Sequence, residues 1–397
     1  NNNPNGIQCP NAEIGVIYGI GGRKFEKVPI PDMCCSYCAT SSTCQCWDWN
    51  NETLLCYLKS NCNSKKSDKN RISGIFKKST SIPPEAKMDY DDSSWELVDA
   101  PHDMLIVQSF NRSSSERQAF LPRNSGWYRK NFYLPADYES SYVEFYTEGI
   151  FHETTVYVNG NYLTTHKQGY TSFSIRLDNI SNIKFGKTDL NTIALAVDAT
   201  TGTGWWYEGG GLMRHNFIVR KHPTHFKENS AWVYSTTLNN MDVATGLSAF
   251  RFGEEDSSVL HINADIRQPT ANLIVDASVI DHDNIIIGKA SSFVSLKNNS
   301  VSLDVQIENT KFWSVQDPYL YTVELKLMDS SSRVLFDLIN ITTGVRSVQF
   351  DPKRGLFINN ENVKLRGFCD HSTFGAVGGA VPDRINLYRV QMIRSVG

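Results

Sequence analysis

The chain lacks the features that would assign a membrane or nucleic-acid role at once. No apolar run in its 397 residues reaches the ~18–20 residues that a membrane-spanning helix needs. The net charge is only −3, whereas a dedicated nucleic-acid binder usually carries a basic domain or stripe. Internal repeats, low-complexity tracts and a Gly-x-Gly-x-x-Gly nucleotide signature are missing as well. This length predicts about two to four domains, each with a core of its own.

Cysteine is scarce everywhere except near the N-terminus. Cys369 alone lies beyond residue 62, and we expect it to be a buried thiol rather than a nucleophile. The dense, even cluster predicts a disulfide framework, because so small a core usually needs covalent cross-links; its pairing stays open. A zinc site at Cys35-x-x-Cys38 is the alternative, although a second such pair is missing. The clustered cysteines are Cys9, Cys34, Cys35, Cys38, Cys44, Cys46, Cys56 and Cys62.

Five Asn-x-Ser/Thr sequons agree with the oxidising compartment that the cysteines indicate. Together they predict a secreted, extracellular protein, or one routed to a lysosome or vacuole. The first six residues lack the charged and apolar regions of a signal peptide. We therefore expect that a signal has been removed or that the chain is an internal piece of a longer one. The sequon asparagines are Asn51, Asn111, Asn179, Asn298 and Asn340.

Turn signals and periodicity divide most of the chain into a small module and two all-β domains. Residues 1–78 form the disulfide-rich module, and residues 79–84 are a polar linker that ends in two prolines. Residues 85–222 and 228–345 carry short alternating strands of the kind found in β-sandwiches. Asn159-Gly160 is the strongest hairpin signal in the sequence.

The last segment, residues 346–397, has a different character. Residues 363–368 are typical of a buried strand, and a glycine-rich loop follows it. Asp383 is the expected N-cap of a helix, because apolar residues recur after it at the spacing of one helix face. A strand, a loop and a helix form the opening unit of an α/β domain rather than a whole domain.

The module resembles the apple/PAN family of extracellular modules. The resemblance is carried by Cys34-Cys35-x-x-Cys38, Cys44-x-Cys46-Trp-x-Trp49 and Cys56-Tyr-Leu-Lys59. It implies a helix that disulfides hold to an antiparallel sheet, and a protein or glycan as the ligand of the module.

From about residue 85 onward a second set of motifs follows in order. These motifs are Pro101-His-Asp103, Gly126-Trp-Tyr-Arg-Lys130, Val156-Tyr-Val-Asn-Gly160, Gly169-Tyr170, Gly204-Trp-Trp-Tyr-Glu-Gly-Gly-Gly-Leu-Met-Arg214, Asp317-Pro-Tyr-Leu-Tyr321, Thr343-Gly-Val-Arg346 and Leu365-Arg-Gly-Phe-Cys-Asp-His371. They resemble glycoside hydrolase family 2, the β-galactosidase, β-glucuronidase and β-mannosidase group. The resemblance implies a mainly β, multidomain chain: a jelly-roll sugar-binding domain at 85–222, an immunoglobulin-like sandwich at 228–345, and the start of a (β/α)₈ TIM barrel at 346–397.

The same resemblance implies a retaining glycosidase that cleaves terminal β-linked sugars, with galactose as the expected sugar. It implies no organic cofactor and no metal site in this stretch. Such an enzyme needs two carboxyl groups about 5–5.5 Å apart. The family's catalytic glutamates sit on later barrel strands, so we nominate no catalytic residue here and expect this chain to be inactive alone. The adjacent carboxylates of Asp91-Asp92 and Glu254-Glu255 are predicted to be surface charge.

The resemblance does imply residues at the rim of a sugar pocket. Asp370 and His371 would end the first barrel strand, where His371 can donate to a sugar hydroxyl. Trp205, Trp206 and Glu208 lie in a glycine-rich loop that would reach toward the barrel mouth. Aromatic faces suit the C–H faces of a sugar, and a carboxylate accepts its hydroxyl protons. The expected partner is a β-galactoside or a related carbohydrate, with no nucleic acid and no membrane span.

Several alternatives stay open. His371 can instead be a structural histidine that serves the next loop, and the Trp pair can fill a domain interface. Arg214 is expected to donate a hydrogen bond between domains. For the whole protein, the alternative is a non-catalytic, lectin-like carbohydrate- or protein-binding protein.

Overall fold

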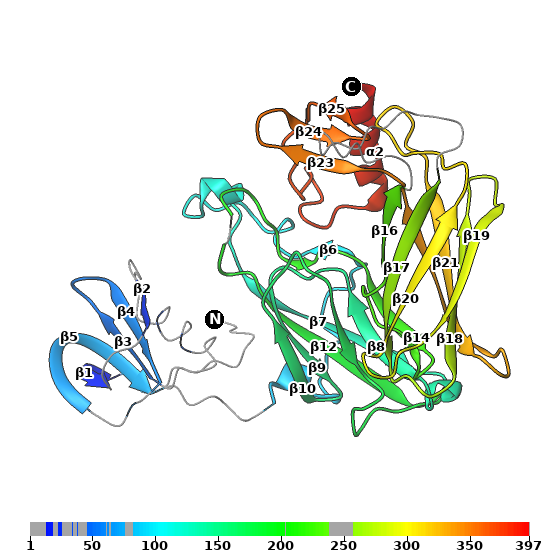
Figure 1. The fold of residues 1–397 in the computed structure, drawn as a ribbon. Coiled ribbons are helices and arrows are strands. Elements are labelled where there is room, and N and C mark those ends of the chain that lie inside the picture. The colour runs from blue at the N-terminus through cyan, green and yellow to red at the C-terminus, as the bar shows by residue number, and fades with distance from the viewer. Residues whose placement is uncertain are drawn as a thin grey trace.

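The computed structural model describes residues 13–18, 23–25, 34, 38, 46–60, 62, 65–75, 82–202, 204–237 and 257–396. Antiparallel sheets dominate these residues, and one long helix, α2 (Asp383–Ser395), lies near the C-terminal end (Figure 1). The predicted mainly β, multidomain class is therefore confirmed. None of the described helices combines the length and apolarity that a bilayer-crossing segment needs.

The N-terminal module contains a five-stranded sheet in the order β1-β5-β3-β4-β2. Two of its disulfides join Cys34 to Cys56 and Cys46 to Cys62. Cys38 is disulfide-bonded as well, which argues against the zinc alternative; Cys9, Cys35 and Cys44 lie outside the described residues. The strands are β1 (Glu13–Tyr18), β2 (Arg23–Phe25), β3 (Cys46–Asn50), β4 (Leu55–Lys59) and β5 (Lys65–Ile75).

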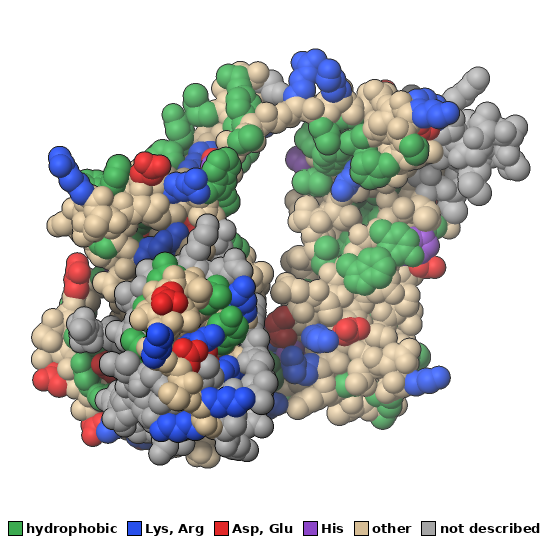
Figure 2. All heavy atoms as spheres, turned by 90° about the vertical axis from the view of Figure 1, so that its left-hand side faces the viewer, with side chains coloured by type: hydrophobic (Ala, Val, Ile, Leu, Met, Phe, Trp, Pro, Cys, Tyr) green, Lys and Arg blue, Asp and Glu red, His purple; other side chains and the backbone are tan. Residues whose placement is uncertain are grey.

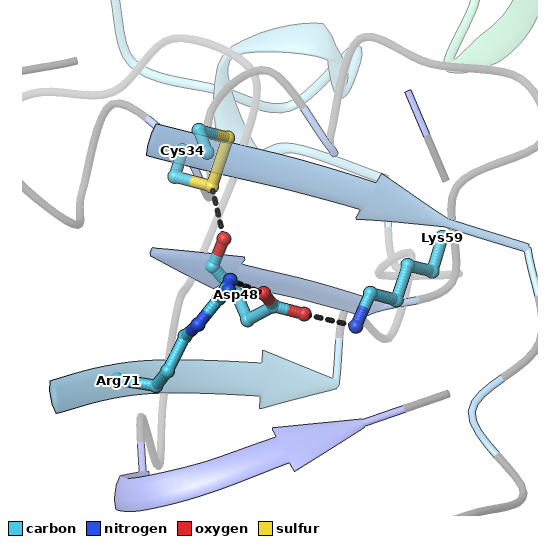
Figure 3. The surroundings of a disulfide bond; sticks show 5 residues. Cys34, Asp48, Lys59 and Arg71 are labelled. Carbon is cyan, nitrogen blue, oxygen red and sulfur yellow. Dashed lines mark hydrogen bonds and ion pairs between the residues drawn. A yellow bond between two sulfur atoms is a disulfide. The ribbon is translucent and has the colours of Figure 1, made fainter. Parts of the chain in front are cut away.

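A buried carboxylate joins the three central strands of this module (Figure 3). Asp48 on β3 is ion-paired with Lys59 on β4 and with Arg71 on β5, and its side chain is almost wholly buried. The Cys34 sulfur lies 3.5 Å from the Asp48 carbonyl oxygen, so the disulfide packs against the same point. Lys and Arg side chains on the visible face of the module are interspersed with acidic ones (Figure 2). Identity with an apple/PAN module stays a prediction.

Two sheets form the first sandwich, with strand orders β10-β9-β12-β7 and β11-β8-β14. Their facing side chains make one apolar core, which includes Val156, Leu177 and Leu195. Asn159 and Gly160 form the two-residue hairpin turn with φ of 48° and 80°, which confirms the predicted hairpin. The strands are β7 (Ser125–Tyr133), β8 (Tyr142–Thr147), β9 (Glu153–Val158), β10 (Asn161–His166), β11 (Phe173–Arg176), β12 (Leu190–Asp198) and β14 (Asn216–Lys221).

Short elements decorate this sandwich. A two-stranded ladder pairs β6 (His102–Asp103) with β13 (Gly211–Leu212) and draws two of the motif segments together. Three 3₁₀ turns cover Pro84–Ala86, Glu116–Gln118 and Ala136–Tyr138.

The second sandwich stacks a sheet of β15, β16, β17 and β20 on the sheet β19-β18-β21-β22. Alternation of buried and partly exposed side chains along β18, and along β21 as far as Leu327, produces its core, as the period-2 pattern predicts. The strands are β15 (His225–Phe226), β16 (Trp232–Thr237), β17 (Ser258–Arg267), β18 (Leu273–Ile280), β19 (Ile286–Phe293), β20 (Ser300–Ile307), β21 (Tyr321–Asp329) and β22 (Leu335–Thr343).

A charged cluster joins the two sandwiches. Glu228 contacts Lys221 of the first sandwich, and His225 and Arg267 of the second at 3.4 and 3.5 Å. Burial raises the pKa of Glu228, but hydrogen bonds from His225 and Lys221 outweigh burial and hold that pKa well below its ordinary value. The ionised Glu228 carboxylate therefore stabilises the junction.

The C-terminal segment differs from its sequence expectation. A meander of β23 (Val348–Asp351), β24 (Gly355–Ile358) and β25 (Glu361–Val363) comes first. The buried strand predicted at 363–368 is wrong: residues 364–371 form no strand and are exposed, with Leu365 at 77%. Cys369 is exposed too, so the expectation of a buried thiol is also wrong. The described residues offer this stretch no partner strand, and a parallel strand needs one to satisfy its backbone.

The helix predicted after the glycine-rich loop is present as α2. Pro382 rather than Asp383 is its N-cap, and Asp383 opens the first turn. No residue of α2 is buried, and its apolar side chains, including Leu387, Val390 and Met392, face solvent. One half of the expected β-α unit is thus formed, and the barrel itself stays a prediction.

Candidate functional site

Asp103 is the buried centre of the contact between the first sandwich and the C-terminal segment. Its Oδ1 accepts hydrogen bonds from the amides of Leu105 and Gly210 at 2.9 and 3.1 Å. Its Oδ2 accepts from the Tyr207 hydroxyl at 2.9 Å and from the Gly379 amide at 2.8 Å. A single carboxylate therefore fixes the loop 204–214 and the segment around 379 against each other.

Two glycines are required where the backbone approaches this carboxylate. Gly209 has φ of +78° and Gly378 has φ of +61°, conformations that favour glycine. A Cβ atom would lie 2.4 Å from Asp103 Oδ2 at Gly209 and 2.1 Å at Gly378, which is closer than any side chain tolerates. Gly209 and Gly378 thus let their two segments close around Asp103.

The phenols around the Asp103 centre keep their protons. Burial first, and then the charge of Asp103, raises the pKa of Tyr207 and of Tyr128. Burial and the Glu208 carboxylate raise the pKa of Tyr170 in the same way. Of the three, the Tyr207 hydroxyl donates to the Asp103 carboxylate.

A small cavity of about 40 Å³ opens beside this centre. Two motif segments, the Gly169-Tyr170 turn and the loop 204–214, meet the segment 372–379 there. The lining residues are Glu148, Phe151, Gly169, Tyr170, Glu208, Met213, Arg214, Ser372 and Gly379.

The structure brings two of the five sequence-predicted rim residues into direct contact. The rings of Trp206 and His371 meet edge to face, with centroids 4.6 Å apart. The Trp206 carbonyl also accepts a hydrogen bond from Gln118, which fixes the loop. Trp206 therefore does contribute to the contact between domains, as its alternative interpretation predicted, and it holds the His371 ring at the surface.

The other three predicted residues lie in different surroundings. Glu208 is buried, and its Oε2 lies 3.3 Å from Arg123 Nη2, so its carboxylate is committed to an ion pair beside the cavity. Trp205 is 72% exposed and presents its ring to solvent. Asp370 is exposed, with its carboxylate 3.7 Å from Arg389 of α2.

Arg389 holds the loop that carries His371. Its guanidinium donates to the His371 carbonyl at 3.2 Å and to the Thr373 carbonyl. Helix α2 is thus the element that positions the predicted sugar-facing loop.

The predicted interdomain donor, Arg214, bonds differently from expectation. It donates to the Met213 carbonyl at 3.4 Å within its own loop. The neighbouring His215 makes the bond between domains instead, with Nε2 3.0 Å from Asp383 Oδ2 at the start of α2. The side chain of Arg214 lines the cavity.

Sequence reasoning did not assign a role to Asp103, Tyr170 or Ser372, although the first two lie in quoted motifs. An acidic residue two positions after a proline, together with a later triple glycine, is the signal that could have pointed to Asp103. Within the described part of the chain, no group of three or more His, Cys, Asp or Glu side chains is placed to hold a metal ion.

Comparison with known proteins agrees with this architecture. The chain is 29% identical over 320 residues to a putative beta-glucuronidase of Formosa agariphila, covering 79% of this chain and 28% of that protein. It is 28% identical over 307 residues to a beta-galactosidase of Thermoanaerobacter pseudethanolicus, covering 75% and 38%. The chain therefore spans about a third of the length of these curated relatives.

Solved structures show the same arrangement. A beta-glycosidase from Bacteroides vulgatus superimposes with a TM-score of 0.66 at 26% identity, covering 78% of this chain and 38% of that one. A glycosyl hydrolase family 2 member from Bacteroides cellulosilyticus gives 0.67 at 26% identity, covering 80% and 42%. The described fold is thus similar to that of solved glycosidase structures over about four fifths of this chain.

One family model matches part of the chain. Residues 254–346 match the model of Glycosyl hydrolases family 2. Similarity to glycosidases, among them a solved family 2 member, extends over about four fifths of the chain, in agreement with the motif resemblance.

Proposed function

We propose that the chain is the N-terminal part of a retaining family 2 glycosidase that hydrolyses O-glycosyl bonds of terminal β-linked sugars. Galactose is the proposed sugar, and glucuronate is the one to test beside it. The support comes from the ordered motifs and from relatives whose names are beta-galactosidase and beta-glucuronidase.

One observation carries this proposal. The Asp103 centre fixes the sandwich loop 204–214 to the segment that the family resemblance identifies as the start of a barrel. Around this joint Leu365, Phe368 and the apolar side of α2 face solvent. A barrel that continues from α2 would cover these side chains, and such barrels carry their active sites at the C-terminal ends of the strands.

The rim residues have distinct proposed roles. Trp205 offers an exposed aromatic face to the C–H face of a sugar, and the His371 ring, held by Trp206, donates to a hydroxyl. Asp370 accepts a hydroxyl proton at the same rim. Glu208, in its ion pair with Arg123, holds the loop rather than the sugar. The acid/base and nucleophilic carboxylates are proposed to lie on later barrel strands.

We also propose that the protein is secreted. All five sequon asparagines are exposed, and the described cysteines of the module are joined as disulfides. Both features suit an oxidising compartment.

The test uses the purified 397-residue protein with aryl β-galactosides and aryl β-glucuronides. We expect no turnover above buffer, because two carboxylates are proposed to be missing. Extension of the reading frame should supply an Asn-Glu pair and a further strand-end glutamate, and the extended protein should cleave one of the two substrates. His371→Ala in that protein should raise KM more than it lowers kcat.

Two results would contradict the proposal. Appreciable turnover by the 397-residue protein would mean that the catalytic carboxylates lie within it. An immediate stop codon after Gly397, together with glycan binding by this chain, would favour the lectin-like alternative.

A further inference from the structure

The outer face of the sheet formed by β16, β17 and β20 carries an aromatic row that no described residue covers. Trp232 and Tyr234, two positions apart on β16, point to the same side and are 55% and 46% exposed. His261 of β17 lies directly opposite Tyr234. We call Trp232, Tyr234 and His261 the aromatic ladder.

The rings of the aromatic ladder are stacked and held in place. The Trp232 and Tyr234 ring centroids are 5.2 Å apart with planes 16° from parallel, and those of Tyr234 and His261 are 4.6 Å apart at 24°. His261 is fixed from both sides, because its Nε2 lies 2.8 Å from Thr236 Oγ1 and its Nδ1 lies 2.7 Å from Asp304 Oδ1. A face ordered before binding loses little side-chain entropy when a ligand arrives.

Short polar side chains run beside the ladder. Asn263 lies opposite Trp232, and Ser302 lies opposite Asn263 on the next strand. The carboxylates of this face have cationic or histidine partners: Asp304 contacts His261, and Asp265 lies 3.8 Å from Lys227. The face therefore offers aromatic rings, hydroxyl and amide groups, and balanced charge.

This chemistry selects among ligand classes. A nucleic acid or an acidic glycan would need an excess of Lys and Arg, which the face lacks. The core of a protein interface is usually depleted of charged side chains, whereas Asp304, Asp265 and Lys227 border the ladder. A neutral pyranose chain has apolar C–H faces and a hydroxyl edge, so it matches both components.

We propose that the aromatic ladder is a binding platform for a neutral β-linked oligosaccharide chain. Trp232 and Tyr234 contact the C–H faces of sugar rings, and Asn263 and Ser302 hydrogen-bond to their hydroxyls. None of the proposed rim residues of the candidate active site belongs to this platform. It therefore goes beyond the proposed hydrolysis and would hold a polymeric ligand without cleaving it.

The test is native electrophoresis of the full chain through gels that contain β-1,4-galactan, hydroxyethyl cellulose or, as the charged comparison, polygalacturonate. We expect retardation by at least one neutral polymer and none by polygalacturonate. Trp232→Ala and Tyr234→Ala should each raise the dissociation constant at least tenfold. Phe293→Ala, which removes a 67% exposed aromatic ring from the opposite sheet, is the matched control and should stay within twofold.

Each variant is first checked by circular dichroism and thermal melting, so a misfolded one is set aside and the other ladder variant decides. The proposal is overturned if neither neutral polymer retards the chain, or if both ladder variants bind like the parent. It is equally overturned if sedimentation shows a dimer that Trp232→Ala abolishes while no polymer binds, because the face would then be a protein contact. None of these outcomes depends on hydrolytic activity.

Discussion

Replacement of Asp103 by asparagine tests the joint between the first sandwich and the C-terminal segment. The substitution keeps the shape of the side chain and one carbonyl oxygen, which can still accept from Leu105 and Gly210. The other oxygen becomes an NH₂ group that faces the Tyr207 hydroxyl and the Gly379 amide. The Tyr207 hydroxyl and the Gly379 amide, which both donate in the parent, then face a third donor, the new NH₂ group.

The cost follows from the hydrogen bonds lost. A buried donor without a partner costs about 1–3 kcal/mol. Tyr207 can rotate its hydroxyl and accept from the new amide, but the Gly379 amide cannot adapt. We therefore expect Asp103→Asn to destabilise the joint by about 2 kcal/mol at least. Asp103→Ala, which leaves five donors without this acceptor, should cost about 4 kcal/mol or more.

Hydrogen exchange measured by mass spectrometry reports this loss locally, which suits a chain of several domains better than a global melt. In Asp103→Asn, peptides that contain Gly210 and Gly379 should exchange about 30-fold faster, since about 1.4 kcal/mol corresponds to a factor of ten. Asp99→Asn, at an exposed aspartate nearby, is the control and should leave both peptides unchanged. Exchange within threefold of the parent in Asp103→Asn would refute the claim that this carboxylate joins the segments.

Three further outcomes are expected. Because the pKa of Glu228 is lowered in the folded state, the stability that its carboxylate contributes is present above the ordinary pKa of 4.5 and is lost as pH falls. In urea titrations, the difference in unfolding free energy between the parent and Glu228→Gln should therefore shrink from pH 7 to pH 3. A difference that stays constant would contradict this. The Cys34–Cys56 disulfide spans 22 residues, so replacing both cysteines by alanine should destabilise the module by about 3 kcal/mol. Tryptophan fluorescence of the module during unfolding measures this change. A change under about 1 kcal/mol would show that the other disulfides keep the module stable without this one. Secretory expression in a eukaryotic host should yield N-glycans that a peptide N-glycosidase removes, and an unchanged mass would count against the secretory route. The expected acceptors are Asn51, Asn111, Asn179, Asn298 and Asn340.

Local sequence patterns predicted most strands of the two sandwiches. Strands such as β12 and β21 form where β-branched and aliphatic residues cluster or alternate, because a strand places successive side chains on opposite faces. The Asn159-Gly160 hairpin was predictable for the same kind of reason, since its two residues adopt the positive φ values that the turn requires. The motifs likewise predicted the similarity to glycoside hydrolase family 2.

Strand prediction failed at residues 364–368, where the apolar pattern was present but the neighbouring strands were not. A strand's backbone groups need partners that come from elsewhere in the chain. The exposure of Cys369 follows from the same absence of a sheet around it in the described residues.

The sequence by itself therefore determined the strand periods, the hairpin turn and the segments that carry the motifs, because each depends on residues close together in the chain. Tertiary structure alone decided which motifs meet. Asp103 and Gly379 are 276 positions apart, yet one hydrogen bond joins them. The burial of Glu208, the exposure of Trp205 and the stacking of the aromatic ladder were decided in the same way, since burial and contact depend on packing between distant segments.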